Sequence, residues 1–115
     1  MSVACGVDGG VVSERLEYDE YVVEASVNNA SSDYVQITFY NNGPHGGSCD
    51  DKHLKSFLIA PKSSQKVKES WWCKMDQNFS IGANLLKGEE VTIVGTTAVI
   101  DCVESGCNLA QHSLK

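Results

Sequence analysis

The sequence lacks any long apolar run: no stretch approaches the ~20 consecutive apolar residues that a membrane-spanning helix requires. It also lacks the spacings that mark common catalytic sites, including a phosphate-binding loop, a nucleophile elbow and a dinucleotide fingerprint. The only helix-like window, residues 13–18, is too short to form a convincing helix. We therefore expect no membrane insertion, no helical fold and no enzyme.

The overall composition indicates one small globular domain that spans residues 1–115. Hydrophobic residues make up 42% of the chain and charged residues 21%, which is typical of a folded rather than a disordered protein. A chain of this length buries roughly two-thirds of its unfolded surface, which is enough for a single core.

Charge is unevenly distributed along the chain, whose net charge is −6. Residues 1–51 carry nine acidic side chains and one arginine, whereas residues 52–74 carry six lysines and one glutamate. Because a mostly acidic surface repels phosphate, we expect no nucleic-acid partner. The lysine segment is either a local site for an anionic contact or, as we favour, a solvated strand whose lysines guard a sheet edge.

Five cysteines in 115 residues, none in a Cys-x-x-Cys spacing, are more typical of a disulfide framework than of a zinc or redox site. The first residues, Met-Ser-Val-Ala-Cys-Gly, contain no stretch of the signal-peptide kind. That start fits either a cytosolic protein or one whose leader is removed. The cysteine content favours the second explanation, so we expect a secreted, extracellular protein.

An odd number of cysteines leaves at least one without an intramolecular partner, and fifteen arrangements with two bridges remain open. Cys102 and Cys107 enclose only four residues, a turn-like loop that can bring two backbones within the range of a disulfide. Cys49 and Cys73 each lie where a predicted strand meets a loop. Cys5 is then left as a free thiol or as the link of a homodimer, and without that link we expect a monomer.

Alternating apolar and polar residues predict strands along most of the chain. The expected strands are residues 11–18, 21–27, 34–40, 57–60, 65–73, 79–85, 91–94 and 97–102. Breakers separate them, among them residues 41–47 (Asn-Asn-Gly-Pro-His-Gly-Gly) and a bend at Gly95. The predicted fold is all-β: a disulfide-stabilised antiparallel β-sandwich or barrel of about eight strands.

Aromatic residues on these strands are candidates for a binding surface. Trp71 and Trp72 are neighbours on one strand, so we expect one to be buried and the other partly exposed. Tyr34 and Tyr40 share one strand face, which points either to solvent or to a second sheet. The predicted contacts with a host protein or a surface glycan are Trp72, Tyr34, Tyr40, Lys66 and Lys68.

Catalytic and metal-binding alternatives centre on one loop. Cys49 is four residues from both His45 and His53. This spacing is compatible with a Cys49 thiolate activated by a histidine base, or with a metal site formed by the three side chains. A disulfide is the simpler use of Cys49, and we predict no catalytic residue, metal or cofactor. Glu89 and Glu90 are adjacent and would face opposite sides of a strand, so we interpret them as solvated residues rather than a glycosidase pair.

Two Asn-x-Ser segments match the N-glycosylation pattern. Asn29 is expected in a loop, where a eukaryotic secretory pathway could modify it, whereas Asn78 opens a predicted strand. Any glycan is therefore expected on Asn29.

The cysteines and aromatics form a recognisable layout: an early lone cysteine, a mid-chain cysteine, a Trp-Trp-Cys segment with an aromatic-led strand after it, and a close cysteine pair. The residues are Cys5, Cys49, Trp71-Trp72-Cys73, Phe79-Ser80-Ile81, Cys102 and Cys107. This layout resembles the Alternaria major-allergen family of fungal secreted β-barrels.

The resemblance implies a β-barrel with internal bridges from Cys49 to Cys73 and from Cys102 to Cys107, and dimerisation through Cys5. It also implies a non-enzymatic, allergen-like role as an effector or elicitor that acts on plant defence proteins, with a small aromatic ligand as a further option.

A second resemblance leads to an alternative function. Ile37-Thr38-Phe39-Tyr40, followed by His45 and Gly47, is similar to the first hairpin of βγ-crystallin Greek keys. Residues 28–32 (Asn-Asn-Ala-Ser-Ser) are loosely similar to the calcium sites of that family. This resemblance implies a carbohydrate- or calcium-binding module.

Overall fold

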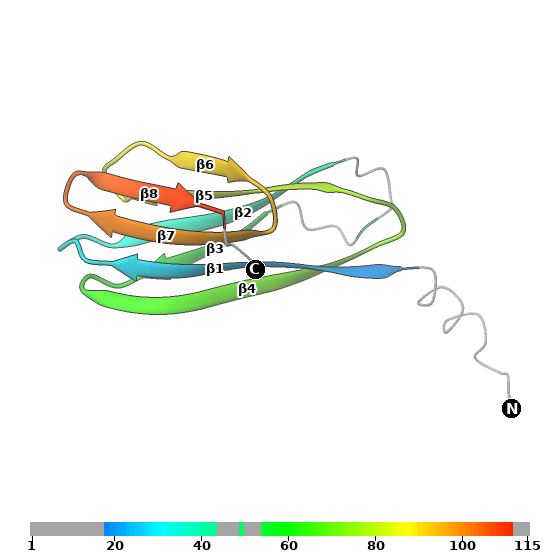
Figure 1. Cartoon of the computed structure of the whole chain (residues 1–115), viewed down its shortest axis with the longest axis horizontal. Helices are drawn as coiled ribbons and strands as arrows, with labels where there is room; N and C mark the ends of the chain where they lie inside the picture. Colours follow the sequence, from blue (N-terminus) through cyan, green and yellow to red (C-terminus); the bar gives the residue numbers. More distant parts are fainter. Residues whose placement is uncertain (1–17, 44–48, 50–53, 112–115) are drawn as a thin grey trace, which may run out of the picture.

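The computed structural model describes residues 18–43, 49 and 54–111, and this part of the chain contains no helix that could cross a membrane. Its eight strands are β1 (Asp19–Asn29), β2 (Val35–Gly43), β3 (Leu54–Ile59), β4 (Ser63–Cys73), β5 (Asn78–Leu85), β6 (Val91–Val94), β7 (Thr97–Val103) and β8 (Gly106–Ala110). They form two four-stranded sheets with the core between them, so the predicted all-β fold is confirmed, as a sandwich rather than the barrel that the allergen-family resemblance implies (Figure 1).

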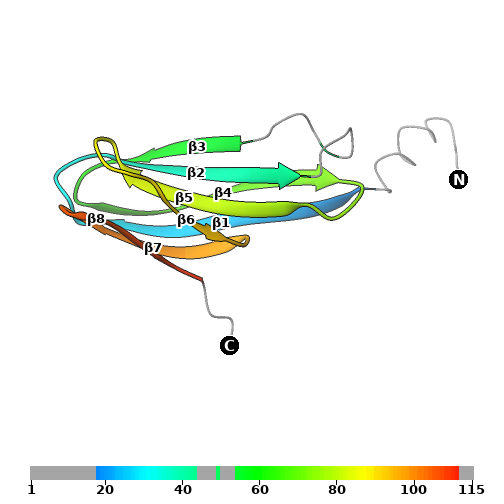
Figure 2. The same ribbon diagram turned by 90° about the horizontal axis from the view of Figure 1, so that it is seen from above.

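The strand order is β4-β1-β7-β8 in one sheet and β3-β2-β5-β6 in the other. Each connection reverses the chain, so odd-numbered strands run one way and even-numbered strands the other (Figures 1 and 2). Because β1 and β7 are neighbours and both odd, they pair in parallel, while the other described strand pairs are antiparallel. This parallel pair is a departure from the predicted antiparallel arrangement.

The described strands also differ from the expected ones near the chain ends. Residues 11–17 of the expected first strand lie outside the described residues, and Tyr18 belongs to no strand.

The last strand, β8, is not predicted, although its residues Cys107 and Leu109 pack against the core two positions apart. β8 returns from β7 through a two-residue turn and places Cys107 directly opposite Cys102. The turn-like loop expected between these cysteines is therefore the end of a hairpin.

The core follows the predicted alternation, because every strand that contributes to it has one face turned to the other sheet. The largest fully buried apolar side chains are Trp71, Phe39, Ile37, Ile59, Ile81, Ile100, Val23 and Val35. The ring centroid of Trp71 lies 5.3 Å from that of Phe79. Trp72 points to the outer face and is half-buried, so the expectation for the two tryptophans is confirmed.

Two disulfides lie at opposite ends of the sandwich, Cys49–Cys73 and Cys102–Cys107. The long strand β1 spans the distance between them, because Asp19 at its start pairs with Cys73 and Asn29 at its end pairs with Cys102. Each disulfide joins residues that face each other in a β-bridge or a hairpin. Both ends of the sheet β4-β1-β7-β8 are therefore covalently tied.

These are the two bridges that the allergen-family resemblance implies. Intramolecular disulfides persist in oxidising compartments and are rare in the cytosol, so they indicate an oxidising environment for this protein. Cys5 lies outside the described residues, and the Cys5-linked dimer stays a prediction.

Aromatic side chains cluster at the Cys73 end. Tyr21 packs on Phe79 with 5.8 Å between the ring centroids, and its hydroxyl donates a 2.7 Å hydrogen bond to Asp76 in the β4–β5 connection. Because the carboxylate binds only the protonated phenol, this hydrogen bond, with a smaller contribution from desolvation, raises the pKa of Tyr21 to about 12. The hydrogen bond fastens the β4–β5 connection to β1.

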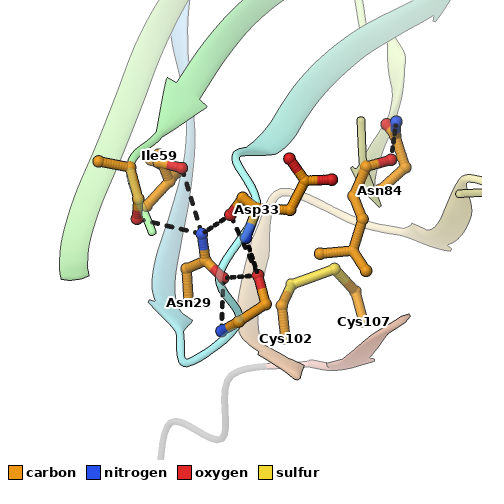
Figure 3. The surroundings of a disulfide bond; sticks show 9 residues. Asn29, Asp33, Ile59, Asn84, Cys102 and Cys107 are labelled. Atoms are coloured by element: carbon orange, nitrogen blue, oxygen red, sulfur yellow. Dashed lines mark hydrogen bonds between the residues drawn. A yellow bond between two sulfur atoms is a disulfide. The ribbon is translucent and has the colours of Figure 1, made fainter. Parts of the chain in front are cut away.

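The opposite end is joined by a buried asparagine. Asn29 has no exposed surface, and its Nδ2 donates to the carbonyl oxygens of Asp33 (2.8 Å), Ile59 (3.3 Å) and Ala60 (3.0 Å) (Figure 3). Its Oδ1 accepts hydrogen bonds from the amide (3.0 Å) and the hydroxyl (2.6 Å) of Ser31. One side chain thus links the β1–β2 connection to the β3–β4 connection and satisfies polar groups that would otherwise be buried without partners.

This burial overturns the expected loop position of Asn29. Asn29 is the last residue of β1, and its Nδ2, the atom that would carry a glycan, is enclosed by three carbonyl oxygens. A glycan at this atom is incompatible with the fold. Asn78, by contrast, is exposed at the start of β5.

Replacing Asn29 with alanine is expected to lower the free energy of unfolding by about 2–3 kcal/mol, because buried carbonyl and amide groups lose their partners. Urea denaturation followed by circular dichroism measures the loss. The matched control is Asn28→Ala, which removes an exposed amide that accepts a single hydrogen bond from Ser64 (2.9 Å). That control should change stability by less than about 0.5 kcal/mol. Equal losses in the two variants would contradict the role assigned to Asn29.

Candidate functional site

The sandwich presents two outer faces to solvent. The outer face of β3-β2-β5-β6, which we call the tyrosine face, carries Tyr34, Gln36, Thr38, Tyr40, Leu54, Ser56, Leu58, Asn84 and Glu90. The outer face of β4-β1-β7-β8, the lysine face, carries Glu24, Ser26, Asn28, Ser64, Lys66, Lys68, Trp72, Val99 and Asp101. The five predicted contact residues are therefore divided: the structure brings the two tyrosines to one face, and Trp72 and the two lysines to the other.

Both tyrosines point away from the core. Tyr34 is 46% exposed just before β2, where its carbonyl accepts a 3.1 Å hydrogen bond from the Leu86 amide and extends the ladder. Tyr40 is half-buried on the same face of β2. The alternative in which these tyrosines pack against the second sheet is therefore wrong.

A hollow of about 360 Å³ lies on the tyrosine face, and cross-strand rows of side chains explain its shape. The middle row is Ser56, Thr38 and Gly82, and the flanking rows are Leu54 with Tyr40, and Leu58 with Gln36 and Asn84. Because Ser56 and Thr38 are short, they form the floor, and the longer side chains of Leu54, Tyr40, Gln36 and Asn84 stand on either side of it. The residues that line this hollow, here called the Tyr40 hollow, are Gln36, Thr38, Tyr40, Leu54, Ser56, Asn84, Gly88 and Glu90.

A carboxylate is held over the floor of the Tyr40 hollow. Glu90 immediately precedes β6, and its Oε2 accepts a 2.8 Å hydrogen bond from the hydroxyl of Tyr40. Gly82 leaves room for this side chain, since a Cβ at position 82 would collide with the Glu90 carboxylate. Partial burial, together with the hydrogen bond and the negative charge of Glu90, raises the pKa of Tyr40. Tyr40 therefore stays protonated at neutral pH and continues to orient the carboxylate.

The remaining polar groups of the hollow supply both donors and acceptors. Thr38 and Ser56 share a 3.4 Å hydroxyl contact on the floor. Asn84 donates one hydrogen bond, of 2.9 Å, to the carbonyl of Leu85. Among the described residues, the Gln36 side-chain amide has no hydrogen-bond partner. The hollow thus combines a positioned carboxylate, two amides, two hydroxyls and an aromatic ring.

The lysine face is organised differently. Lys66 lies 3.5 Å from the carboxylate of Glu24, and both side chains are solvated, so the pair contributes little to stability. β4, which carries Lys66 and Lys68, is an edge strand of its sheet. This placement agrees with the favoured interpretation of the lysines as guards of a sheet edge.

A second, larger hollow of about 420 Å³ lies on the lysine face. It is lined by Ser26, Val27, Asn28, Ser64, Gln65, Lys66, Val99, Ile100 and Asp101. None of these residues is aromatic, and its cation, Lys66, is already paired with Glu24. Trp72 lies at the Cys73 end of β4 and does not line this hollow. The Tyr40 hollow therefore has the more specific arrangement of groups.

The loop that suggested catalysis or metal binding is only partly described. Cys49 is in a disulfide, so it has no thiolate to act as a nucleophile or a metal ligand. His45 and His53 lie outside the described residues. Within residues 18–43, 49 and 54–111, no group of three or more potential metal-ligating side chains is found.

No family model matches this chain, and no curated protein is similar to it at a significant level. A proposal of function therefore depends on the geometry of the two faces, on the disulfides and on the resemblances noted in the sequence.

Sequence reasoning missed Glu90 and Gly82 as members of the site. Glu90 is exposed, in agreement with its interpretation as a solvated residue, but it also reaches across the sheet to Tyr40. A glycine inside an alternating strand is a signal for close approach by another group, and Gly82 in β5 carries that signal. The approaching group could not be identified, because Glu90 reaches Gly82 from a connection outside β5.

Proposed function

We propose that this protein is a secreted, non-enzymatic binding protein of the fungal effector or elicitor type, which recognises a ligand on a host surface through its tyrosine face. The observation that carries the proposal is the Tyr40 hollow, where Tyr40 holds the Glu90 carboxylate at 2.8 Å over a floor of short side chains.

The side chains around the Tyr40 hollow lie mostly on strands that are packed firmly against the core, and this supports a binding role for the tyrosine face. Most of the hollow is built on β2, β3 and β5, whose inner faces carry fully buried residues, including Phe39, Ile59 and Ile81, while Gly88 and Glu90 belong to the β5–β6 connection. Leu54 (53% exposed) lines the hollow, and Leu58 (58% exposed) lies on the same outer face of β3; both are large apolar side chains that lose water when a partner covers them. A preformed surface of this kind binds without the entropic cost of ordering a loop.

Secretion and the effector role have separate support. The two disulfides fit an oxidising, extracellular setting. The effector role comes from the resemblance to the Alternaria allergen family, which makes plant surfaces the first to test. The calcium-binding alternative has less support, because Asn29 and Ser31, in the segment similar to calcium sites, already bond to each other and to nearby carbonyls.

A pair of face-specific variants tests this proposal. Leu54→Asp with Leu58→Asp places one charge in the lining of the Tyr40 hollow and a second on the same face of β3, and we expect the affinity of the labelled protein for plant cells to fall roughly tenfold or more. Binding of the fluorescent protein to intact plant cells and to cell-wall preparations is measured by cytometry and sedimentation.

The matched control is Val99→Asp with Val103→Asp on β7, which makes the same kind of change at exposed aliphatic residues of the other sheet. This control should bind like the unmodified protein. Loss of binding only in the control would move the site to the lysine face. A native protein that binds no plant surface would refute the proposed role.

A further inference from the structure

We infer that the Tyr40 hollow is a saccharide site that takes one uncharged, hydroxyl-rich sugar unit. This inference rests on the proposed function and specifies the ligand of the same face. Its basis is the pairing of a positioned carboxylate with amides and hydroxyls in a hollow that is too small for a large ligand.

The hydrogen-bonding groups match sugar hydroxyls. A hydroxyl both donates and accepts, and the hollow offers acceptors in Glu90 and both functions in Gln36 and Asn84. The hydroxyl of Tyr40 donates to Oε2 of Glu90 at 2.8 Å, which restrains the carboxylate and leaves its other oxygen as an acceptor for a ligand. An ammonium or guanidinium group can only donate, so such a group by itself would leave the amide N–H groups of Gln36 and Asn84 without acceptors.

The apolar side chains of the hollow are suited to the C–H groups of a sugar ring. Leu54 and the ring of Tyr40 oppose each other across β3 and β2 in the same cross-strand row. A pyranose has C–H groups that pack on such surfaces while its hydroxyls point to the polar wall. The volume of about 360 Å³ is near the lower end of the range for ligand pockets, which fits one sugar unit rather than an extended chain.

Charge restricts the choice of sugar. Among the residues that the structure describes, Glu90 is the only charged one that lines the hollow, and no described lysine or arginine lines it. A carboxylated or sulfated sugar would therefore be repelled without a compensating cation. The lysine face does carry cations, but it lies on the other side of the sandwich. The site should select uncharged sugars over uronic acids of the same stereochemistry.

The first experiment applies the full 115-residue, oxidised chain to a printed glycan array that contains neutral and acidic oligosaccharides. We expect binding to neutral glycans, and titration with the corresponding free monosaccharide should give a dissociation constant of about millimolar order. Carboxylated counterparts should bind at least about tenfold more weakly. Preference for acidic glycans would overturn the inference.

Three variants locate the site. Glu90→Gln keeps the size of the side chain and its ability to accept from Tyr40, and its loss of charge should weaken sugar binding about tenfold or more. Glu89→Gln removes the same charge from the neighbouring residue, which does not line the hollow, and should bind like the native protein. Gly82→Ala keeps the Glu90 charge but displaces the carboxylate, so it should lose binding as well. Equal binding by Glu90→Gln and the native protein would overturn the site assignment.

A treatment of the plant surface separates this inference from the proposed function. Periodate oxidises sugar diols, so it should abolish binding of the protein to plant cells if the ligand is a saccharide. If binding withstands periodate, is removed by protease treatment of the cells, and still requires Leu54 and Leu58, the partner is a protein. The saccharide inference then fails while the proposed function stands.

Discussion

Trp71→Ala is expected to lower the free energy of unfolding by about 3–5 kcal/mol. Trp71 has no exposed surface, and its ring lies 5.3 Å from that of Phe79, so truncation leaves a cavity between the two sheets. A domain of this kind has a total stability of about 5–15 kcal/mol, so the variant should be close to unfolding. Urea denaturation monitored by far-ultraviolet circular dichroism measures the loss.

The adjacent tryptophan supplies the control for this substitution. Trp72 is half-buried on the lysine face, and Trp72→Ala should cost less than half as much as Trp71→Ala. If Trp71→Ala does not fold, Trp71→Phe gives a smaller, measurable loss at the same position, because an aromatic ring still fills most of the space. A larger loss at Trp72 than at Trp71 would contradict the assignment of the core face.

Removal of the Cys49–Cys73 disulfide, by alanine at both positions, is expected to cost about 3.5 kcal/mol. The two residues are 24 apart in sequence, so the bridge excludes many conformations of the unfolded chain. It also ties the β2–β3 connection to the end of β4, where Cys73 is fully buried. Reversible urea denaturation of the double variant gives the value.

The second disulfide is the internal comparison. Cys102 and Cys107 are only 5 residues apart, and the loop they close is short, so their joint replacement by alanine should cost about 2 kcal/mol. The hairpin of β7 and β8 also holds these residues opposite each other through its own hydrogen bonds. An equal or larger loss for this pair would show that restriction of the unfolded chain does not dominate.

Period-two alternation was sufficient to predict most strands and their inner faces. Residues 21–27, 34–40, 65–73 and 79–85 each lie within an observed strand or extend one residue beyond it. These strands are buried on one side only, so each leaves a local signature that needs no knowledge of its neighbours. β8 is the exception, because its short inner face offers only Cys107 and Leu109.

The candidate site was predictable only in part. Tyr40 was identified because an aromatic residue on the polar face of a strand stands out in the sequence. Glu90 and Gly82 were missed, since their relation to Tyr40 depends on which strands are neighbours. Trp72 and the lysines were grouped with the tyrosines, whereas the structure places them on the opposite sheet.

The alternating pattern is enough to establish an all-β protein with one buried tryptophan of the pair and cysteines next to strand ends, because each of these properties is local. Tertiary structure alone decided the division of the strands into two sheets, the parallel pairing of β1 with β7 and the split of the aromatic residues between two faces. It also created the Tyr40 hollow, by setting Thr38 of β2 beside Ser56 of β3 and by bringing Glu90 over Gly82 of β5. The physical reason is that hydrogen bonds between strands join residues far apart in the chain, and the pairing order is not encoded in the pattern of any single strand.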